Sequence, residues 1–186
     1  LYLRMKGFRG YTDQELDLSS ITSVLITGPT GSGKSSVPGA MLLALTGENG
    51  SSDPNGHIKE GCDLGQVEYR FEHGGSTYRI VHIDSLKTSR KKTDRQFAVS
   101  DGNGGWIPKG GKSLAETNAE ILRVIGQSYN ELTCGPFALQ DQASRFLDPG
   151  EMRIDGKVYS GRSARLQVAV KMLGLSRYED LRRLAT

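Results

Sequence analysis

Hydrophobic and polar residues alternate with a period of two near the start of the chain. Residues 1–8 alternate in this way and predict a half-buried β-strand. Residues 15–18 can pair with this strand after a turn at residues 10–13. The chain is therefore expected to open with β structure.

The same alternation recurs later and predicts two β-hairpins. Residues 66–72 and 77–83 alternate on either side of the turn residues 73–76. The second hairpin consists of residues 95–99 and 106–107, which flank the glycine-rich turn at residues 101–105. These hairpins predict an antiparallel β layer.

Helical patterns lie between and after these strands. Residues 40–45 are apolar nearly all round, which predicts a helix buried against a sheet and ended by Gly47. Pro38 lies about one turn into this helix, so we expect a kink or a late helix start. Residues 113–116 form a capping box that opens another helix, ended by Gly126. One face of that helix is expected to hold Leu114, Ile121, Leu122 and Ile125.

The last third of the chain is less regular. Residues 136–139 predict a short buried strand with Gln140 at its end. Residues 165–173 predict a helix, and a second capping box at residues 176–179 opens one that runs to Thr186 without a glycine cap. We expect this last helix to continue in a longer parent protein.

Charge adds one local feature to this picture. The chain has 186 residues and a formal net charge of +3, which suits one domain with a substantial core and does not by itself indicate nucleic-acid binding. A basic cluster nevertheless falls between the two hairpins, at Lys87, Arg90, Lys91, Lys92 and Arg95. This cluster predicts either a solvated hairpin tip or a surface that contacts a nucleic-acid backbone.

Cysteine and histidine usage suggests no metal or disulfide framework. Cys62 and Cys134 lie far apart with no C-x-x-C spacing, which fits a reducing cytosol. The three histidines, His57, His73 and His82, form no metal-ligand pattern and receive no chemical role. No apolar run approaches the roughly 20 residues needed to span a bilayer. We expect a soluble, cytoplasmic protein that does not act at a membrane.

The strongest signal for chemistry is the segment Gly28–Ser35. It fits the phosphate-binding pattern G-x-x-x-x-G-K-S/T at every fixed position, and it follows residues 23–27, an apolar stretch that predicts a strand. Glycines let successive backbone N–H groups converge on phosphates, and the following helix points the positive end of its dipole at the same anion. The chain is therefore expected to bind a nucleoside triphosphate.

Each residue of the loop has an expected role. Lys34 is expected to reach the β- and γ-phosphates, and the Ser35 hydroxyl to bind Mg²⁺. Ser36 is expected to orient the α-phosphate. The remaining residues expected to line the nucleotide phosphates are Thr30, Gly31, Ser32 and Gly33.

Five segments then carry a family resemblance through their order and spacing. They are residues 6–11, 28–36, 67–80, 139–147 and 173–181. In this order they resemble the N-terminal half of the SbcC family, the SMC-like ATPases that partner the SbcD-type nuclease in DNA double-strand break repair. The resemblance implies that Arg9 approaches the phosphates and that Gln140 senses Mg²⁺ and the attacking water, so that Lys34 and Gln140 are the catalytic residues. It also implies that Lys59 lies in a segment that passes beside the nucleoside.

The resemblance implies a fold and a domain division as well. The fold would be the N-terminal lobe of an α/β P-loop NTPase of the ABC-ATPase type, with a mixed sheet, an antiparallel β layer and a helical appendage leading to a coiled coil. Residues 1–147 would form the ATP-binding lobe, from the phosphate loop to the loop that contains Gln140, called the Q-loop in this family. Residues 148–186 would form the helical segment, in which residues 148–161 look like an insertion.

Partners follow from the same resemblance. They are the C-terminal half of the same ATPase, a second protomer, an SbcD-type nuclease and double-stranded DNA, with ATP driving engagement of the two heads. The chain lacks an L-S-G-G signature and a convincing Walker B acid pair. We therefore expect the full protein to be an ATPase and this chain alone to bind ATP and Mg²⁺ without efficient turnover.

Two other functions are compatible with the phosphate loop. A small P-loop phosphotransferase, such as a nucleotide kinase or a tRNA prenyltransferase, would need Asp84 as its Mg²⁺-organising carboxylate, because residues 80–84 imitate a Walker B strand. The alternation from Thr77 onward instead favours a hairpin strand with Asp84 near its end. A nucleotide-switched binding module without catalysis would keep only the phosphate site and the basic cluster.

Overall fold

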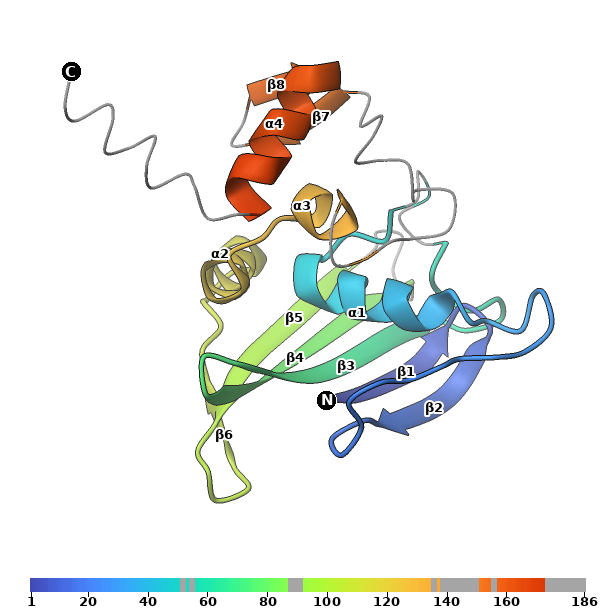
Figure 1. The fold of residues 1–186 in the computed structure, drawn as a ribbon. Coiled ribbons are helices and arrows are strands. Elements are labelled where there is room, and N and C mark those ends of the chain that lie inside the picture. Colours follow the sequence, from blue (N-terminus) through green and yellow to red (C-terminus); the bar gives the residue numbers. More distant parts are fainter. Residues whose placement is uncertain are drawn as a thin grey trace. The chain divides into compact units, whose positions relative to one another are not determined.

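The structure is a computed structural model that describes residues 1–50, 53, 56–86, 92–134, 137, 151–154 and 157–172 (Figure 1). The chain divides into two compact units, Leu1–Gly126 and Gln127–Thr186. The functional division predicted after residue 147 falls outside the described residues and stays a prediction. Among the described helices, none combines the length and the apolar character that crossing a bilayer requires.

The first unit is built on a six-stranded antiparallel sheet. Its order is β2-β1-β3-β4-β5-β6. The strands are β1 (Tyr2–Phe8), β2 (Tyr11–Asp17), β3 (Leu64–His73), β4 (Ser76–Ser85), β5 (Lys92–Ser100) and β6 (Trp106–Pro108). All three predicted strand pairings, β1 with β2, β3 with β4 and β5 with β6, are confirmed. The first turn is tighter than expected, since Phe8 already pairs with Tyr11.

The predicted mixed sheet is wrong for the part of the chain that the structure describes. Every strand pair there is antiparallel. Residues 23–27, expected to form the strand before the phosphate loop, have no strand conformation. A strand exists only within a hydrogen-bonded ladder, and no described strand pairs with this segment. Its Leu25 is 87% exposed as a result.

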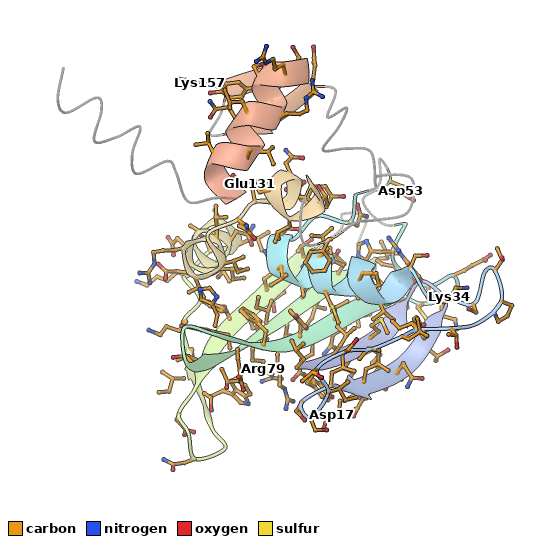
Figure 2. The ribbon with its side chains drawn as sticks, in the orientation of Figure 1. Asp17, Lys34, Asp53, Arg79, Glu131 and Lys157 are labelled. Atoms are coloured by element: carbon orange, nitrogen blue, oxygen red, sulfur yellow. The ribbon has the colours of Figure 1, made fainter. Side chains whose placement is uncertain are left out.

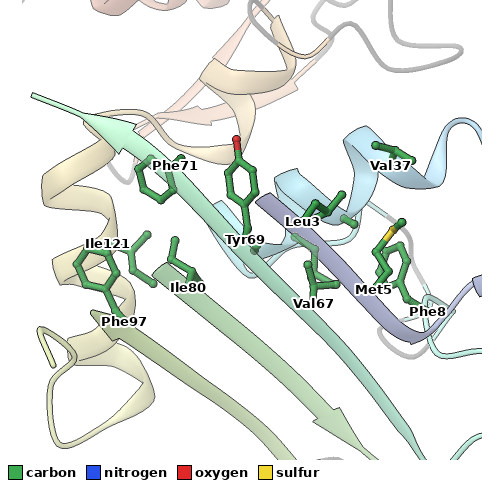
Figure 3. Close-up of a cluster of buried hydrophobic side chains, with 13 residues drawn as sticks. Leu3, Met5, Phe8, Val37, Val67, Tyr69, Phe71, Ile80, Phe97 and Ile121 are labelled. Carbon is green, nitrogen blue, oxygen red and sulfur yellow. The ribbon is translucent and has the colours of Figure 1, made fainter. Parts of the chain in front are cut away.

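Two helices cover one face of the sheet and enclose the core. Helix α1 (Ser36–Thr46) packs on β1, β3 and β4, while α2 (Leu114–Ile125) packs on β5 (Figure 1). Because side chains alternate along a strand, one face of the sheet supplies most of the core. Figure 3 shows these side chains between sheet and helices: Leu3, Met5, Val67, Tyr69, Phe71, Ile80 and Phe97 from the strands, with Val37 and Ile121 from the helices.

The bounds of α1 explain how it tolerates a proline. The helix starts at Ser36, two residues after Lys34, so Pro38 lies in its first turn. Backbone N–H groups in a first helical turn have no partner within the helix, so proline costs little there. The helix ends at Gly47, as predicted, where φ is 80° and the N–H donates to the Leu43 carbonyl at 2.8 Å.

Helix α2 confirms its predicted ends but not the whole of its predicted face. The Ser113 side chain accepts a hydrogen bond from the Glu116 N–H at 3.2 Å, and Gly126 caps the other end. Leu114 and Leu122 are 41% and 49% exposed, so their assignment to the buried face is wrong. The face that meets the core is rotated toward Thr117, Ile121, Val124 and Ile125, which are spaced by three to four residues.

The opposite face of the sheet carries a network of charges. Glu68 is 6% exposed and accepts hydrogen bonds from Arg79 at 2.9 and 3.1 Å and from Arg70 at 2.8 Å (Arg79 is labelled in Figure 2). Arg70 also lies 4.2 Å from the centre of the Tyr2 ring. Burial raises the pKa of Glu68, but the two arginines outweigh it and hold that pKa below its ordinary value.

The second unit is a small α/β arrangement. It contains α3 (Tyr129–Cys134), the antiparallel hairpin of β7 (Glu151–Ile154) and β8 (Lys157–Ser160), and α4 (Gly161–Met172). Ala164 and Val168 of α4 are buried, with Tyr159 packed against them. The helix predicted at residues 165–173 is confirmed as far as Met172. The strand predicted at 136–139 and the capping box at 176–179 belong to the parts of the chain that the structure leaves undescribed.

Candidate nucleotide-binding site

The glycine-rich loop leads directly into α1, as the motif predicts. Gly33 has φ of 88°, a left-handed conformation that side-chain-bearing residues rarely adopt. The Ser36 N–H donates to the Gly33 carbonyl at 2.8 Å, which begins the helical turn, and Ser36 itself is buried. Ser35 precedes the helix at its N-cap position and is exposed. The loop therefore ends at the positive end of the α1 dipole.

Lys34 lies across the loop that precedes it. Its Nζ donates hydrogen bonds to the carbonyls of Gly28 at 2.7 Å and Pro29 at 2.6 Å. Figure 2 shows Lys34 at the start of α1. An ammonium group with short bonds to two loop carbonyls is a concentrated positive charge within the glycine-rich loop.

Tyr11 is a site residue to which the sequence assigned no role. Its hydroxyl donates to the Gly33 carbonyl at 3.3 Å, and a Cβ placed on Gly33 would lie 3.2 Å from the Tyr11 ring. Glycine at position 33 is thus required by this close approach as well as by its φ angle. The contact joins the start of β2 to the phosphate loop, a distance in sequence that no local pattern could reveal.

Arg9 occupies the turn between β1 and β2 in an uncommon conformation. Its φ is 47°, the only positive φ of a non-glycine residue among those described. The Arg9 N–H donates to the His57 carbonyl at 2.7 Å, which holds this turn in place. Its guanidinium lies over Gly39, where an added Cβ would approach Nη1 to 3.0 Å. Arg9 therefore lies beside the first turns of α1, and its contact with the phosphates stays a prediction.

Lys59 is tied to the same turn. Its Nζ donates to the Thr12 hydroxyl at 2.7 Å and to the Gly10 carbonyl at 3.3 Å. Its backbone N–H donates to the Gly7 carbonyl at 2.9 Å. The β1–β2 turn thus links Arg9, Lys59 and, through Tyr11, the phosphate loop. The predicted place of Lys59 beside the nucleoside is not tested by these contacts, and Gln140 lies outside the described residues.

The basic cluster between β4 and β5 is smaller than its sequence suggested. Lys92 is exposed, but Arg95 is only 6% exposed, so its assignment to the basic surface is wrong. Arg95 lies two residues before Phe97 on β5, which places both on the core-facing side. The other members, Lys87, Arg90 and Lys91, are not described by the structure.

Arg95 instead connects three elements. Its guanidinium donates hydrogen bonds to the Ala44 carbonyl in α1 and to Asn118 Oδ1 in α2. Burial lowers the pKa of Arg95 to about 10, with the charge of Asp84 acting in the opposite direction.

Asp84 occupies the position that imitates a Walker B acid, and it is not available to a nucleotide. It lies in β4, a hairpin strand as the alternation predicted, and is fully buried. Thr93 donates a hydrogen bond to Oδ1, and the Nε2 atoms of His57 and His82 lie 2.8 and 3.0 Å from Oδ2. Burial raises the pKa of Asp84, but these three neighbours hold it well below its ordinary range.

A comparison with known protein families gives a match over the same part of the chain. A protein-family profile described as AAA domain matches residues 2–157, most of the chain. The chain belongs to this AAA domain family. The phosphate loop, α1 and the whole six-stranded sheet lie within the matched residues.

Curated relatives of this chain include SbcC and Rad50 proteins. The SbcC component of the nuclease SbcCD from Deinococcus radiodurans is 31% identical over 139 residues, which is 72% of this chain and 15% of that protein. DNA double-strand break repair Rad50 ATPase of Methanocaldococcus jannaschii is 25% identical over 183 residues, 95% of this chain and 15% of that protein. The SbcC component of Lactococcus lactis is 27% identical over 154 residues, 79% of this chain and 14% of that protein. The predicted resemblance to the SbcC family is confirmed, and the chain spans about a seventh of the length of these relatives.

Proposed function

We propose that this chain binds ATP with Mg²⁺ through the loop at Gly28–Ser36. The observation that carries the proposal is the placement of the Lys34 ammonium in a glycine-rich loop that opens into α1. The loop backbone and Lys34 would hold the phosphates, and the exposed Ser35 hydroxyl would bind Mg²⁺. Mg²⁺ bound there supplies charge neutralisation of the phosphate oxygens.

In the parent protein this site would belong to an SMC-like ATPase. The relatives named as components of the nuclease SbcCD and as Rad50 DNA repair ATPases support this placement. ATP would hold two heads together, and an SbcD-type nuclease would process double-stranded DNA ends. Arg9, Lys59 and Gln140 would complete the nucleotide site, the last as a sensor of Mg²⁺ and water.

An exposed apolar segment supports the C-terminal half as a partner. Val24, Leu25 and Ile26, which precede the phosphate loop, are 49%, 87% and 41% exposed. A groove of about 480 Å³ runs beside them, lined by apolar side chains that include Leu16, Val37 and Met41. Leaving three consecutive apolar residues in water is unfavourable, and covering them with strands of the C-terminal half would complete a larger sheet.

The alternative of a small phosphotransferase is not favoured. Such an enzyme needs a carboxylate that can reach Mg²⁺ within this chain. Asp84, the candidate the sequence offered, is fully buried beside His57 and His82 and lies on an antiparallel hairpin strand. We therefore propose that this chain alone binds ATP without efficient turnover and that the water-activating carboxylate comes from elsewhere in the parent.

Calorimetry with ATP and Mg²⁺ tests the binding site. Lys34→Ala deletes charge-assisted hydrogen bonds of roughly 1.5–3 kcal/mol each, so ATP affinity should fall at least about tenfold. Lys6→Ala, at an exposed position on β1, is the matched control and should bind as the wild type does. Equal affinity of the Lys34→Ala variant and the wild type would contradict the site.

Adding the C-terminal half in trans tests whether ATP hydrolysis requires that half of the parent protein. ATP hydrolysis should stay near background for this chain alone and appear when that half is supplied. Leu25→Asp should leave the stability of the chain within about 0.5 kcal/mol of wild type, since the side chain is exposed, and should prevent the gain in hydrolysis. Brisk hydrolysis by the isolated chain would contradict this proposal and reopen the phosphotransferase alternative.

A salt titration tests the proposed contact with DNA. Replacing Lys91 and Lys92 by Ala should weaken duplex DNA binding and flatten its dependence on salt, because each phosphate contact releases counterions. An unchanged salt slope would assign these lysines to a solvated hairpin tip.

A further inference from the structure

Three titratable side chains meet inside the first unit, away from the phosphate loop. His82 and Asp84 alternate with Ile80 along β4, so they share the core-facing side of the sheet. His57 comes from the segment that follows α1, and its imidazole contacts the Asp84 carboxylate. His57 and His82 are 2% exposed and Asp84 is fully buried. The core of the sheet therefore ends in a polar cluster that the sequence pattern did not reveal.

The geometry of this cluster is convergent. Nε2 of His57 lies 2.8 Å from Asp84 Oδ2, and Nε2 of His82 lies 3.0 Å from the same oxygen. The two imidazole rings stand edge to face, with centres 6.2 Å apart. One potential ligand atom from each of the three residues falls within 4.8 Å of the other two. Two imidazole nitrogens and one carboxylate oxygen thus face a common point.

Hydrogen bonding accounts for only part of this convergence, because Nε2 of His82 and Oδ2 of Asp84 form a hydrogen bond at 3.0 Å. Nε2 of His57 is buried and makes no hydrogen bond, although it lies close to the Asp84 carboxylate. Although His57 Nε2 lies only 2.8 Å from Asp84 Oδ2, the alignment of the two groups does not fit a hydrogen bond. This buried nitrogen therefore faces the same point as Nε2 of His82 without a partner of its own. Leaving a buried nitrogen unpaired costs free energy, so its position favours a bound ligand.

We propose that His57, His82 and Asp84 bind one transition-metal ion of the Zn²⁺ class. Imidazole nitrogen and carboxylate oxygen are ligands that Zn²⁺ uses at about 2.0–2.2 Å, and three protein ligands leave its fourth position for a water. Mg²⁺ prefers a shell of oxygens and is disfavoured by two imidazoles. The site is therefore distinct in chemistry from the Mg²⁺ position proposed at Ser35.

The surroundings supply an outer shell for the histidine ligand. The amide nitrogen of Asn49 lies 3.1 Å from Nδ1 of His57. A metal on Nε2 requires the tautomer with a proton on Nδ1, so the Asn49 amide would turn its oxygen to that proton and give up the hydrogen bond that its nitrogen donates to the Asp53 carbonyl at 2.9 Å. Thr93 donates to Oδ1 of Asp84, which leaves Oδ2 facing the two imidazoles.

One neighbour limits the affinity. The buried guanidinium of Arg95 interacts electrostatically with Asp84 and so shares its negative charge. Because the Arg95 guanidinium repels a bound Zn²⁺ ion, Zn²⁺ binds Asp84 more weakly than it would bind a carboxylate with no cation nearby. We therefore expect micromolar rather than nanomolar affinity for Zn²⁺.

Metal titration of the untagged full chain tests the site. Wild type should bind one Zn²⁺ in calorimetry, and at a hundredfold excess of Zn²⁺ over Kd its Tm should rise by about 5–10 °C. Co²⁺ should give the intense visible absorption of a tetrahedral ion, without the near-ultraviolet thiolate band that binding at Cys62 would produce. Mg²⁺ at the same concentration should not shift Tm.

Variants assign the ligands. His57→Gln and His82→Gln should each weaken Zn²⁺ binding at least about tenfold, as loss of one of three ligands predicts. His73→Gln is the matched control, because His73 is exposed in the β3–β4 hairpin and should not affect binding. Binding of ATP and Mg²⁺ by each variant reports that it is folded, and failure of nucleotide binding in wild type would count against the ATP site alone.

Two results would overturn the proposal. Wild-type chain that shows no Zn²⁺ binding at millimolar concentration would leave the cluster as a purely hydrogen-bonded one. Zn²⁺ binding that the two glutamine variants retain at wild-type affinity would place the ion elsewhere.

Discussion

Replacing Arg95 by methionine is the sharpest test of how the sheet and its helices are held together. Arg95 is 6% exposed and joins β5 to the Ala44 carbonyl in α1 and to Asn118 in α2. Methionine keeps most of the aliphatic stem and removes only the guanidinium. The change therefore isolates the polar contacts from packing.

The expected loss can be worked from these contacts. Two hydrogen bonds to a charged donor contribute about 1.5–3 kcal/mol each, or roughly 3–6 in total. Burial lowers the pKa of Arg95 to about 10, and removing the charge recovers that desolvation, about 3 kcal/mol. The Ala44 carbonyl and the Asn118 amide oxygen then lose this donor, at roughly 1 kcal/mol each. We expect the free energy of unfolding to fall by about 2–5 kcal/mol.

Urea denaturation followed by circular dichroism measures this change. The midpoint should shift to lower urea with an unchanged slope, because the surface exposed on unfolding stays the same. Lys92→Ala, at the exposed start of the same strand, is the control and should change the free energy of unfolding by less than about 0.5 kcal/mol. The effects of the two variants on DNA binding should be the reverse of their effects on stability. Arg95→Met should leave the salt dependence of DNA binding unchanged, whereas Lys92→Ala should reduce it.

Two outcomes would refute this reasoning. An Arg95→Met variant as stable as the wild type would show that the buried guanidinium does not hold the helices to the sheet. A reduced salt slope of DNA binding in a folded Arg95→Met variant would return Arg95 to the basic surface.

Two further predictions follow from the sheet itself. Gly7→Ala should lower the free energy of unfolding by about 2–5 kcal/mol, because Gly7 has φ of 56° and its added Cβ would lie 2.2 Å from the Leu64 carbonyl oxygen. Thermal denaturation checks this against Gly10→Ala, where an added Cβ meets nothing within 4 Å. Glu68 has a lowered pKa in the folded state, so its stabilisation is present above the unfolded value of about 4.3 and is lost as pH falls through the folded value. Glu68→Gln should therefore flatten the loss of stability in that acid range, whereas Glu72→Gln, exposed on the same strand, should not.

Local patterns in the sequence were sufficient for the hairpins and the helix ends. Alternation with period two predicted β3 with β4 and β5 with β6, because each side chain's face depends only on its neighbours along the strand. The capping box at Ser113 and the glycines at positions 47 and 126 predicted helix bounds for the same reason. The phosphate loop is equally local, since its glycines, lysine and following helix are contiguous.

Periodicity in the sequence also held information about the buried charged residues. Arg95 and Phe97 alternate on one strand, so the same rule that buried Phe97 in the core should have buried Arg95. His82 and Asp84 likewise continue the core-facing register of Ile80. Arg95 was assigned to the basic cluster from its charge, whereas its place in the alternation puts it on the same face as Phe97.

Contacts between distant segments were decided only by the tertiary structure. Tyr11 meets Gly33, Arg9 pairs with His57, and His57 meets Asp84 through strand pairings and loop closures that no local spacing encodes. The order of the sheet brings these segments together, and that order depends on which apolar faces can be buried at the same time. The sequence by itself therefore determined the hairpins, the helix ends and the phosphate-loop motif, while the packing of the sheet decided which side chains surround that loop and which form the buried cluster.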